Sequence, residues 1–396
     1  MKAEDIIMKD FIYNIPTKVY FGRDQLSHLG EELKSFGNKV LLTYGGGSIK
    51  KSGLYSRIVE EINKAGLELY ELNGIEPNPR VTSVARGADL CKEHDIDVIL
   101  AVGGGSVIDA SKFMAAGRYY DGDYWDFHGK KVPIEKALPL VTVLTLAATG
   151  SEMDTGGVIT NPVTHEKIGR QADVLRPKVS FLDPTLTYTV SRYQTACGSA
   201  DILSHLMETY FSREPGMYLT DSVLVGLMKT VIRYAPVACE EPTNYEARAN
   251  LMWASSWAIN GFTRIDKGPN PWSCHPIEHE LSAFYDITHG LGLAIVTPRW
   301  MRHFLNKDTL ERFVQFGIEV WEIDYNLPKK EIALEAIRCL EDFLFKDLAL
   351  TDNLSDLGID DEYFEIMAER VSNYSGAARF QDMSKQDVLD ILNASL

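Results

Sequence analysis

Residues Val40–Ser48 read VLLTYGGGS, and residues Ile99–Ser106 read ILAVGGGS. Each stretch is an apolar, strand-like run that ends in three glycines and a serine. A glycine triplet costs conformational entropy, so it marks backbone that must turn tightly or approach another group closely. Two such triplets indicate either a repeated structural device or two contacts with one extended ligand.

Apolar runs alternate with amphipathic patterns through about residue 190. Uninterrupted Val, Ile and Leu runs are typical of strands buried on both faces of a parallel sheet, and their alternation with helices is typical of βαβ units. The pattern predicts strands over residues 39–44, 67–72 and 97–102, and helices over residues 54–65, 81–93 and 106–116. Each glycine triplet therefore lies where a strand passes into a helix.

The chain after Pro184 follows a different pattern, in which strand-like runs are nearly absent. Helices are predicted over residues 218–235, 244–260, 329–348 and 385–396. Turn and extended signals in LDPTLTYTVS place the boundary near residues 183–191. We therefore predict an α/β domain over residues 1–188 and an all-helical domain over residues 189–396.

Composition and charge narrow the class of protein. With 45% hydrophobic and 10% aromatic residues, the 396-residue chain can bury a sizeable core. A formal net charge of −16 argues against nucleic acid as a partner, because nucleic-acid-binding faces are basic. The five cysteines are scattered and form no CxxC pair, so neither a disulfide framework nor a thiolate metal site is expected.

We expect a cytoplasmic protein that does not bind a membrane. The N-terminal stretch MKAEDIIMKDFIYN mixes acidic with apolar residues and lacks the apolar core of a signal peptide. The run LPLVTVLTLAA is far shorter than a membrane span. The apolar, strand-like segment FIYNIPTKVYFG, residues 11–22, is expected to pair with another chain or to cover a sheet edge.

The second glycine triplet is the better candidate for binding an anion. In GGGSVIDASK, residues 103–112, the glycines let backbone N–H groups approach a phosphate at the start of a helix, and Ser106 offers a hydroxyl. A third small, hydroxyl-rich turn, TLAATGSE, follows the run LPLVTVL, and Asn78 lies in a PNP turn. Loops at the carboxyl ends of parallel strands line one crevice, and a dinucleotide is long enough to contact them all. The plainer interpretation is that glycine-rich turns simply close the corners between strands and helices.

Groups that favour metal ions gather in two short segments of the second half. ACGSADILSHLMETY places Asp201 and His205 four residues apart, hence on one face of a helix. CHPIEHELSAFYDITHG adds His275, His279 and His289. Each histidine alone is more often an ordinary, partly buried residue, but their joint placement favours a metal centre. One carboxylate with several imidazoles suits a divalent ion such as Fe²⁺ or Zn²⁺.

The same histidines admit a second interpretation. His275–His279 spells HPIEH, which fits the H-x-x-E-H pattern of inverted zinc proteases with Glu278 as the base. That interpretation needs both histidines on one regular helix, whereas Pro276 favours a helix that starts there and leaves His275 at its cap. It also leaves the glycine loops and the Asp-x-x-x-His helix without a role.

Taken together, these segments resemble the iron-containing alcohol dehydrogenases, in the branch of the butanol dehydrogenases and aldehyde reductases. The resemblance runs essentially from end to end and rests on VYFG, EPNP, GGGSVIDASK, TLAATGSE, LDP, the Asp201/His205 helix and HELSAFYDITHG. It implies a dinucleotide-binding α/β domain, a helical metal-binding domain and an active site in the cleft between them, an architecture like that of dehydroquinate synthase.

The resemblance also implies individual roles. The metal ligands are Asp201, His205, His275 and His289. His279 is expected beside them, to handle a proton or to support a ligand. Contacts with the cofactor are expected from Asn78, Gly104, Gly105, Ser106, Thr145, Thr149, Lys167 and Leu182. The expected ion is Fe²⁺, with Zn²⁺ as the alternative.

One departure from the family pattern bears on the choice of cofactor. Members that use NAD often carry an Asp after the first strand, where it bonds the ribose 2′-hydroxyl. Here Gly46 takes that place, followed by Ser48, Lys50 and Lys51. Without the carboxylate the 2′-phosphate of NADP is not repelled, and the hydroxyl and ammonium groups can bind it. We therefore expect NADP(H) as the preferred cofactor and NAD(H) as the alternative, with the first triplet receiving the adenosine end.

The sequence thus predicts a metal-dependent alcohol dehydrogenase or aldehyde reductase, acting on a primary alcohol or aldehyde such as butanol or butyraldehyde. A polyol dehydrogenase of the same fold, acting on glycerol or a diol, is the alternative. The family-specific segments argue against dehydroquinate synthase, a lyase that uses NAD transiently. A non-catalytic metal- or nucleotide-binding protein would keep only one of the two sets of motifs. The resemblance also implies a homodimer.

Overall fold

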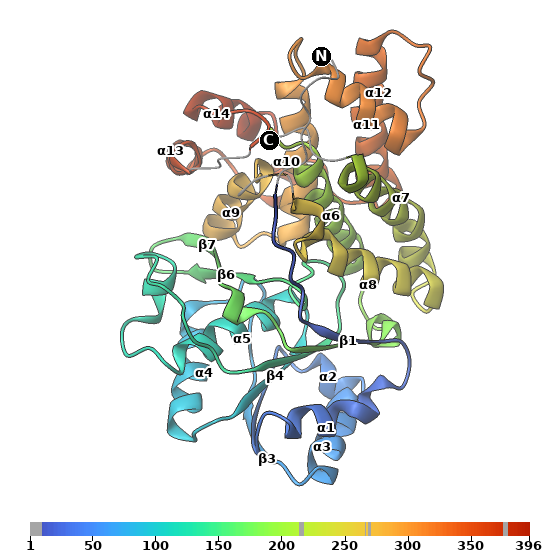
Figure 1. Cartoon of the computed structure of the whole chain (residues 1–396). Coiled ribbons are helices and arrows are strands. Elements are labelled where there is room, and N and C mark those ends of the chain that lie inside the picture. Colours follow the sequence, from blue (N-terminus) through green and yellow to red (C-terminus); the bar gives the residue numbers. More distant parts are fainter. Residues whose placement is uncertain (1–9, 214–217, 266, 268–270, 375–378) are drawn as a thin grey trace. The chain divides into compact units, whose positions relative to one another are not determined.

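A computed structural model of the chain describes residues 10–213, 218–265, 267, 271–374 and 379–396 (Figure 1). The chain divides into two compact units. The α/β unit takes Asn14–Ser191 and Pro242–Ser256, and the helical unit takes the chain up to Tyr13, Arg192–Glu241 and Trp257–Leu396. The two units therefore do not divide the chain at a single point, because Pro242–Ser256 belongs with the first half of the chain.

Parallel strands form the main sheet of the α/β unit, in the order β1–β8–β5–β4–β2–β3 within the described residues. They are β1 (Lys18–Phe21), β2 (Lys39–Tyr44), β3 (Glu68–Leu72), β4 (Val98–Gly103), β5 (Leu140–Leu144) and β8 (Val179–Leu182). β1 pairs with β8 from Lys18 opposite Val179 to Phe21 opposite Leu182. The N-terminal segment thus covers an edge of its own sheet, which is one of the two outcomes expected for it.

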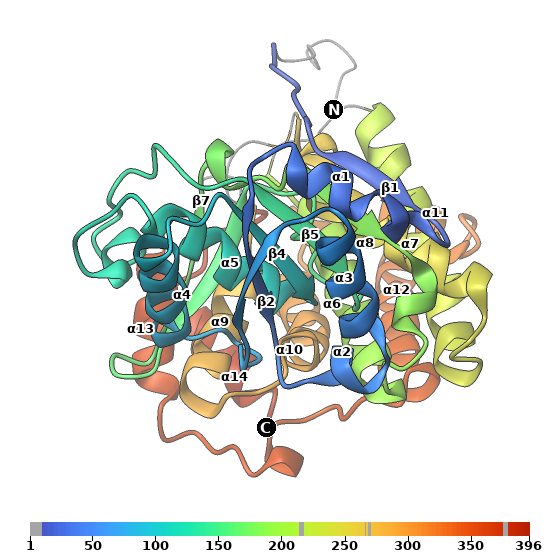
Figure 2. The same ribbon diagram turned by 90° about the horizontal axis from the view of Figure 1, so that it is seen from below.

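Helices lie on both faces of this sheet (Figure 2). Alternate residues of the strands belong to two separate apolar cores, one on each face. Val40 and Leu42 of β2 pack on the side of α1 (Leu29–Lys34) and α3 (Leu54–Lys64). Leu41, between them, packs on the side of α4 (Val81–Glu93) and α5 (Gly105–Gly117). Burial on both faces explains why these strands are uninterrupted apolar runs.

A separate antiparallel hairpin, β6 (Gly156–Asn161) with β7 (Glu166–Gln171), follows β5 and was not predicted from the sequence. Thr160 of β6 forms an isolated bridge with Arg80, and its N–H donates to the carbonyl of Pro79 at 2.8 Å. The hairpin is thereby fixed beside the turn that precedes α4.

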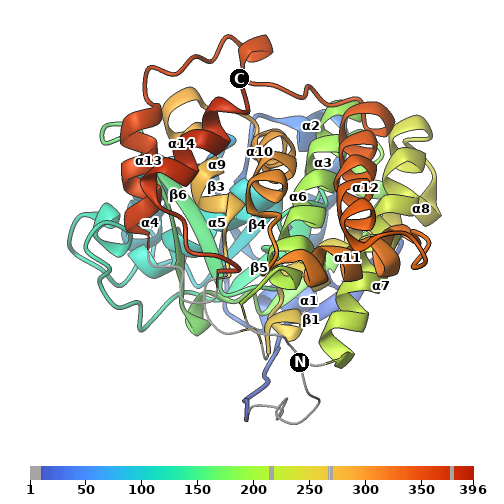
Figure 3. The same ribbon diagram turned by 90° about the horizontal axis from the view of Figure 1, so that it is seen from above.

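Helices dominate the chain after β8, whose described part contains no strand beyond an isolated bridge between Ser212 and Arg379. They include α6 (Arg192–Tyr210), α7 (Tyr218–Glu240), α8 (Tyr245–Ile259), α9 (Cys274–Tyr285), α10 (His289–Phe304), α11 (Leu310–Trp321), α12 (Lys329–Asp342), α13 (Phe364–Asn373) and α14 (Lys385–Asn393). α10 lies at the centre of the helical unit and contacts α6, α9, α12 and α14 (Figure 3). The α/β class with a helical second part, predicted from the sequence, is confirmed.

Most of α8 lies in the α/β unit rather than the helical unit. Met252 joins the apolar core on the α4–α5 side of the sheet. Ser256 donates a hydrogen bond to the buried carboxylate of Glu152. These contacts attach residues 242–256 to a domain from which they are distant in sequence.

α7 is long and apolar enough to cross a membrane when only length and composition are considered. Its buried residues include Leu224, Met228, Val231 and Ala235, which recur every three or four positions. This one-sided stripe is the pattern of a surface helix in a globular domain, and α7 contacts α6 and α11.

Candidate active site

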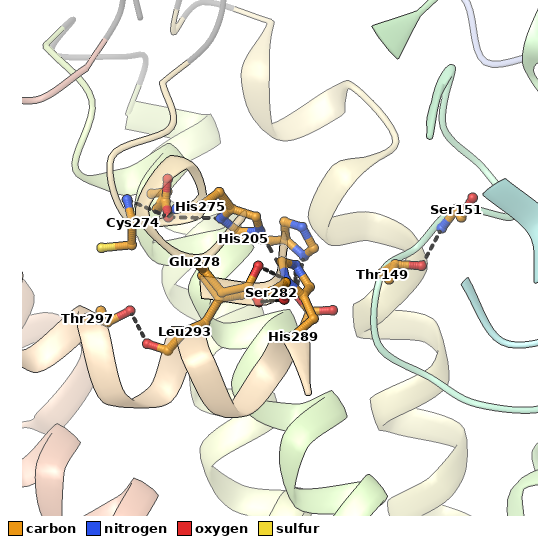
Figure 4. Close-up of polar contacts among 12 residues, drawn as sticks. Thr149, Ser151, His205, Cys274, His275, Glu278, Ser282, His289, Leu293 and Thr297 are labelled. Carbon is orange, nitrogen blue, oxygen red and sulfur yellow. Dashed lines mark hydrogen bonds and ion pairs between the residues drawn. The ribbon is translucent and has the colours of Figure 1, made fainter. Parts of the chain in front are cut away.

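The four residues expected to bind metal come together around one carboxylate oxygen. Asp201 and His205 lie one turn apart on α6, and both are buried. From Asp201 Oδ1, the distance is 3.4 Å to His205 Nδ1, 3.7 Å to His289 Nε2 and 3.9 Å to His275 Nε2. Figure 4 shows the three rings gathered together. Side chains from three helices thus present nitrogen and oxygen atoms to a common point.

The starts of two helices place two of these histidines. His289 is the first residue of α10, and His275 is the second residue of α9. The prediction that α9 begins at Pro276 is wrong, because the helix begins two residues earlier, at Cys274. The Glu208 carboxylate of α6 accepts three successive backbone N–H groups there, at 2.6–3.0 Å. It thereby supplies the partners that the first turn of a helix lacks.

Burial and neighbouring charges shift the pKa values of the cluster. Burial holds the pKa of His205 well below its usual value, and the neighbouring imidazoles act in the same direction. Burial also lowers the pKa of His275, but the carboxylates of Glu208, Asp201 and Glu278 together outweigh it, so this pKa is raised. Burial raises the pKa of the Cys274 thiol well above its usual value. Cys274 therefore stays neutral, and the converging atoms are nitrogen and oxygen.

This donor set fits a divalent transition-metal ion. His205 Nδ1 and His275 Nε2 are buried, and neither forms a hydrogen bond with any residue that the structure describes. Buried polar atoms nearly always have a partner, so two without one beside a carboxylate are typical of a ligand site. One carboxylate and three imidazoles suit Fe²⁺ or Zn²⁺.

His279 lies next to this set. Its ring centroid is 5.7 Å from that of His289 and 6.1 Å from that of His275. The protease interpretation of HPIEH requires Glu278 as a base toward substrate. Instead, the buried Glu278 carboxylate contacts His289 Nδ1 and accepts the hydroxyl of Ser282 (Figure 4). The arrangement therefore disfavours that interpretation.

Two buried glutamates contact the cluster in roles that the sequence analysis missed. Glu208 Oε1 lies 2.9 Å from His275 Nδ1, and Glu278 Oε2 contacts His289 Nδ1. Glu208 follows His205 by three residues, so helical spacing alone placed it on the same face. Glu278 was considered only as a protease base.

Most of the residues expected to contact the cofactor lie at the carboxyl ends of the parallel strands. Gly46 and Ser48 follow β2, Gly104, Gly105 and Ser106 follow β4, Thr145 and Thr149 follow β5, and Leu182 ends β8. The carboxyl ends of parallel strands share one edge, and open α/β sheets bind their ligands there.

The second glycine triplet allows a close approach between two of these loops. A Cβ at Gly105 would lie 2.3 Å from Thr149 Oγ1, so only glycine fits there. Thr149 in turn accepts the N–H of Ser151 at 3.3 Å (Figure 4). Gly104 is the N-cap of α5, and the first N–H groups of a helix have no partner within it, so they can bind an anion.

The first triplet leads into α2 (Ser48–Lys51), which is a single helical turn. Gly47 is its N-cap and has a φ of 99°, a conformation that favours glycine. A Cβ at Gly46 would meet nothing within 4 Å, so space is open at this position. The two triplets therefore differ, because one is closely packed and the other is open.

Lys50 lies over two aromatic rings next to this open loop. Its Nζ is 4.7 Å from the ring centroid of Tyr55 and 5.2 Å from that of Tyr44. Both phenols donate to the carboxylate of Glu71, at 2.6 and 2.8 Å. The Tyr44 hydroxyl raises the pKa of Lys50, so its ammonium stays charged.

The β6–β7 hairpin, which carries Lys167, is bonded to the turn that contains Asn78. Asn78 has a φ of 49° in the turn before α4, and Lys167 pairs with Thr160 across the hairpin. Thr160 donates its N–H to the carbonyl of Pro79, the residue after Asn78, so the strand next to that of Lys167 is held at this turn. Both Asn78 and Lys167 are buried.

A buried polar network, also missed by the sequence analysis, holds the loop after β5. Lys112 of α5, fully buried, donates to Ser151 Oγ at 2.9 Å and pairs with Asp154. Ser151 donates to Asp109 at 2.5 Å. Burial raises the pKa of Asp109 to about 6, an effect that the nearby Lys112 reduces. Both α5 residues come from GGGSVIDASK, so this motif also holds the loop that carries Thr149.

Known proteins match the chain over almost its whole length. Residues 16–184 match the family described as iron-containing alcohol dehydrogenase, and residues 195–396 match the C-terminal domain of the Fe-containing alcohol dehydrogenase family. This chain belongs to the iron-containing alcohol dehydrogenases. It is therefore an NAD(P)-dependent oxidoreductase of alcohols and aldehydes.

Individual relatives cover both nucleotide cofactors. NADH-dependent butanol dehydrogenase A of Clostridium acetobutylicum is 50% identical over 390 residues, which cover 98% of this chain and 100% of the relative. The NADPH-dependent aldehyde reductase YqhD of Escherichia coli is 34% identical over 374 residues, or 93% of this chain and 94% of the relative. The crystal structure of NADH-dependent butanol dehydrogenase A from Thermotoga maritima has a TM-score of 0.92 at 38% identity, covering 98% of this chain and 99% of that one.

Proposed function

We propose that this alcohol dehydrogenase interconverts short primary aldehydes and alcohols, such as butyraldehyde and butanol, at an Fe²⁺ centre. The proposal is carried by the convergence of three histidine nitrogens on Asp201 Oδ1, all within 3.9 Å. Asp201, His205, His275 and His289 would hold the ion. When bound there, a divalent ion supplies a Lewis acid for the substrate oxygen. The butanol dehydrogenases among the relatives support the substrate class.

The chain's own residues then exclude water and handle a proton. Burial of Asp201, His205 and His275 keeps the surroundings of the reacting oxygen poor in water, so charges there interact more strongly. His279 lies next to the converging atoms, and we assign it the transfer of the proton between the substrate oxygen and water.

The cofactor is proposed to lie along the carboxyl edge of the sheet. Gly104, Gly105 and Ser106 would receive the pyrophosphate at the start of α5, which has thirteen residues and a helix dipole pointing its positive end there. Further contacts are proposed from Asn78, Thr145, Thr149, Lys167 and Leu182.

NADP(H) is proposed as the preferred cofactor, with NAD(H) as the alternative. Gly46 offers no carboxylate where an acidic residue would repel a 2′-phosphate, and Ser48, Lys50 and Lys51 follow it. The relatives named above divide between the two cofactors, one group being named NADH-dependent and the Escherichia coli reductase NADPH-dependent.

A homodimer in the cytoplasm is proposed as the working state. The support for the homodimer is the exposed apolar segment before β1, in which Ile12 is 98% exposed and Phe11 is 44% exposed. Such a segment fits a surface that a second copy covers. A molecular mass of one chain by light scattering at micromolar concentration would contradict the dimer.

A substrate and cofactor panel tests the proposed function. The purified protein, loaded with Fe²⁺ or Zn²⁺, is assayed with butyraldehyde, butanol, glycerol and 1,3-propanediol, each with both nucleotide cofactors. We expect butyraldehyde reduction with NADPH to have the highest kcat/KM. Preferential turnover of glycerol or the diol would replace this proposal with a polyol dehydrogenase.

A further inference from the structure

We infer that two buried glutamates, Glu208 and Glu278, position the metal-binding histidines and set how tightly the metal is held. The inference rests on the proposed metal centre. Both glutamates contact a histidine ring on the side away from Asp201. They are therefore positioning residues and not ligands.

Glu278 fixes His289 from a fully packed position. Its side chain is completely buried, its Oε2 contacts His289 Nδ1, and its Oε1 accepts the hydroxyl of Ser282. A Cβ at Gly292 would lie 2.8 Å from Glu278 Cγ, so the glycine leaves just enough room for the carboxylate arm. Because it is confined on both sides, Glu278 holds the His289 ring in one orientation.

Glu208 fixes His275 in the same way and adds a second contact. Its Oε1 lies 2.9 Å from His275 Nδ1, and its two oxygens also accept three backbone N–H groups at the start of α9. One carboxylate thus fixes both the histidine ring and the helix end that carries it.

These contacts determine which nitrogen of each imidazole can bind the metal. An ionised carboxylate only accepts hydrogen bonds, so Nδ1 of His275 and of His289 must each carry the hydrogen. The lone pair is then on Nε2, and it is Nε2 of each ring that faces Asp201, at 3.9 and 3.7 Å. His205 differs, because it presents Nδ1 to Asp201. A carboxylate behind a ligating imidazole fixes its tautomer and raises its basicity.

The same glutamates also shape the charge of the site. Glu208, Glu278 and Asp201 place three carboxylates within one buried cluster. Buried charges are costly unless a counter-charge is present. A divalent cation at the point where the ligand atoms meet offsets this cost, so the carboxylates should favour its binding.

Glu278→Gln tests the inference with Glu280→Gln as the matched control. Glutamine keeps the size and one acceptor oxygen but removes the charge. Glu280 is two residues along the same helix, which places it on roughly the opposite face from Glu278, and it pairs with Arg370 at 3.2 Å. Affinity is measured on metal-free protein by competing Zn²⁺ or Co²⁺ against a chromophoric chelator. We expect Glu278→Gln to bind 10- to 100-fold more weakly than the wild type and Glu280→Gln to bind equally well.

A spectroscopic readout separates positioning from general damage. In the Co²⁺-loaded protein, the visible bands should change in Glu278→Gln and stay unchanged in Glu280→Gln, because only the former replaces the charged acceptor behind a ligand ring with a neutral one. Metal-free melting temperatures show whether each variant is folded. If Glu278→Gln does not fold, Glu208→Gln is measured instead. Wild-type metal affinity and wild-type Co²⁺ bands in that variant would likewise overturn the positioning role.

The outcomes distinguish the inference from the proposed function. A folded Glu278→Gln with wild-type affinity and wild-type Co²⁺ bands would overturn the positioning role. If the wild type itself binds neither ion, the metal centre fails, and with it the proposed function.

Discussion

Replacing Gly46 with aspartate is expected to turn the cofactor preference from NADP(H) toward NAD(H). The position accepts a side chain, because a Cβ there meets nothing within 4 Å. Its backbone is also not in the left-handed region, unlike that of Gly47 with a φ of 99°. The change should therefore act on the bound nucleotide and not on the fold.

The size of the effect follows from the contacts that a 2′-phosphate would make or lose. A hydrogen bond to a charged group contributes about 1.5–3 kcal/mol, and about 1.4 kcal/mol is tenfold in affinity. One contact from Ser48, Lys50 or Lys51 therefore predicts a wild-type preference for NADPH on the order of tenfold or more. In Gly46→Asp the carboxylate repels the phosphate and accepts a ribose hydroxyl instead. We expect the ratio to shift by about ten- to hundredfold toward NADH.

The assay compares kcat/KM for NADPH and NADH in the wild type, Gly46→Asp and Gly46→Asn. Asparagine matches aspartate in size but carries no charge, so it should keep most of the preference for NADPH. The reasoning is refuted if the wild type prefers NADH and Gly46→Asp changes nothing. It is also refuted if Gly46→Asn shifts the ratio as far as Gly46→Asp does, because charge would then not be the cause.

Three further changes test the nucleotide-binding unit. Gly105→Ala should raise KM for both cofactors by tenfold or more, about 1.4 kcal/mol, without changing their ratio. The reason is that the new Cβ would lie 2.3 Å from Thr149 Oγ1. An unchanged KM would contradict this expectation. Lys112→Met should lower the free energy of unfolding by about 3–5 kcal/mol, since it leaves Asp154 without its buried partner; urea denaturation measures it, and a loss below 1 kcal/mol would count against the network. Burial lowers the pKa of His128 from its ordinary value of 6.5 to about 3. Between these two pH values the imidazole is protonated in the unfolded chain but not in the folded one. The stability that this contributes is present above pH 6.5 and lost as the pH falls, by about 2 kcal/mol at pH 5; His128→Leu should therefore lose less stability than the wild type between pH 7 and pH 5, and equal losses would refute the assignment.

The βα units could be predicted because their signals are local. β2 occupies Lys39–Tyr44 and α4 occupies Val81–Glu93, both as predicted. The β6–β7 hairpin was missed although two strand-like runs flank an Asn-Pro pair at residues 161–162. Its attachment through Thr160 to Pro79 is a long-range contact with no signature in either segment.

The candidate site could be predicted in part for the same reason. Helical spacing placed Asp201 and His205 on one face of a helix, and the spacing of three residues from His205 places Glu208 on that face as well. Glutamates are usually exposed, so sequence alone did not mark Glu208 or Glu278 as buried partners of histidine. Pro276 suggested a helix start, but the Glu208 carboxylate accepts the backbone N–H groups of the three residues before it. Such a cap supplied by a distant helix is not visible in the local sequence.

Other expectations stay predictions. The boundary at residues 188/189, the individual ligand roles, the homodimer and the cytoplasmic location are among them. The attachment of residues 242–256 to the α/β unit depends on contacts such as Ser256 with Glu152, which join segments far apart in the chain. Helical patterns in the sequence carry no information about which unit a helix joins.

The most direct test of the central claim is the metal dependence of butyraldehyde reduction. Protein stripped with a chelator is assayed with NADPH before and after reloading with Fe²⁺ under exclusion of oxygen, alongside Asp201→Ala. We predict that stripping abolishes turnover while NADPH binding persists, that reloading restores turnover in the wild type, and that Asp201→Ala stays inactive. Full turnover by the metal-stripped wild type would contradict the metal centre at Asp201.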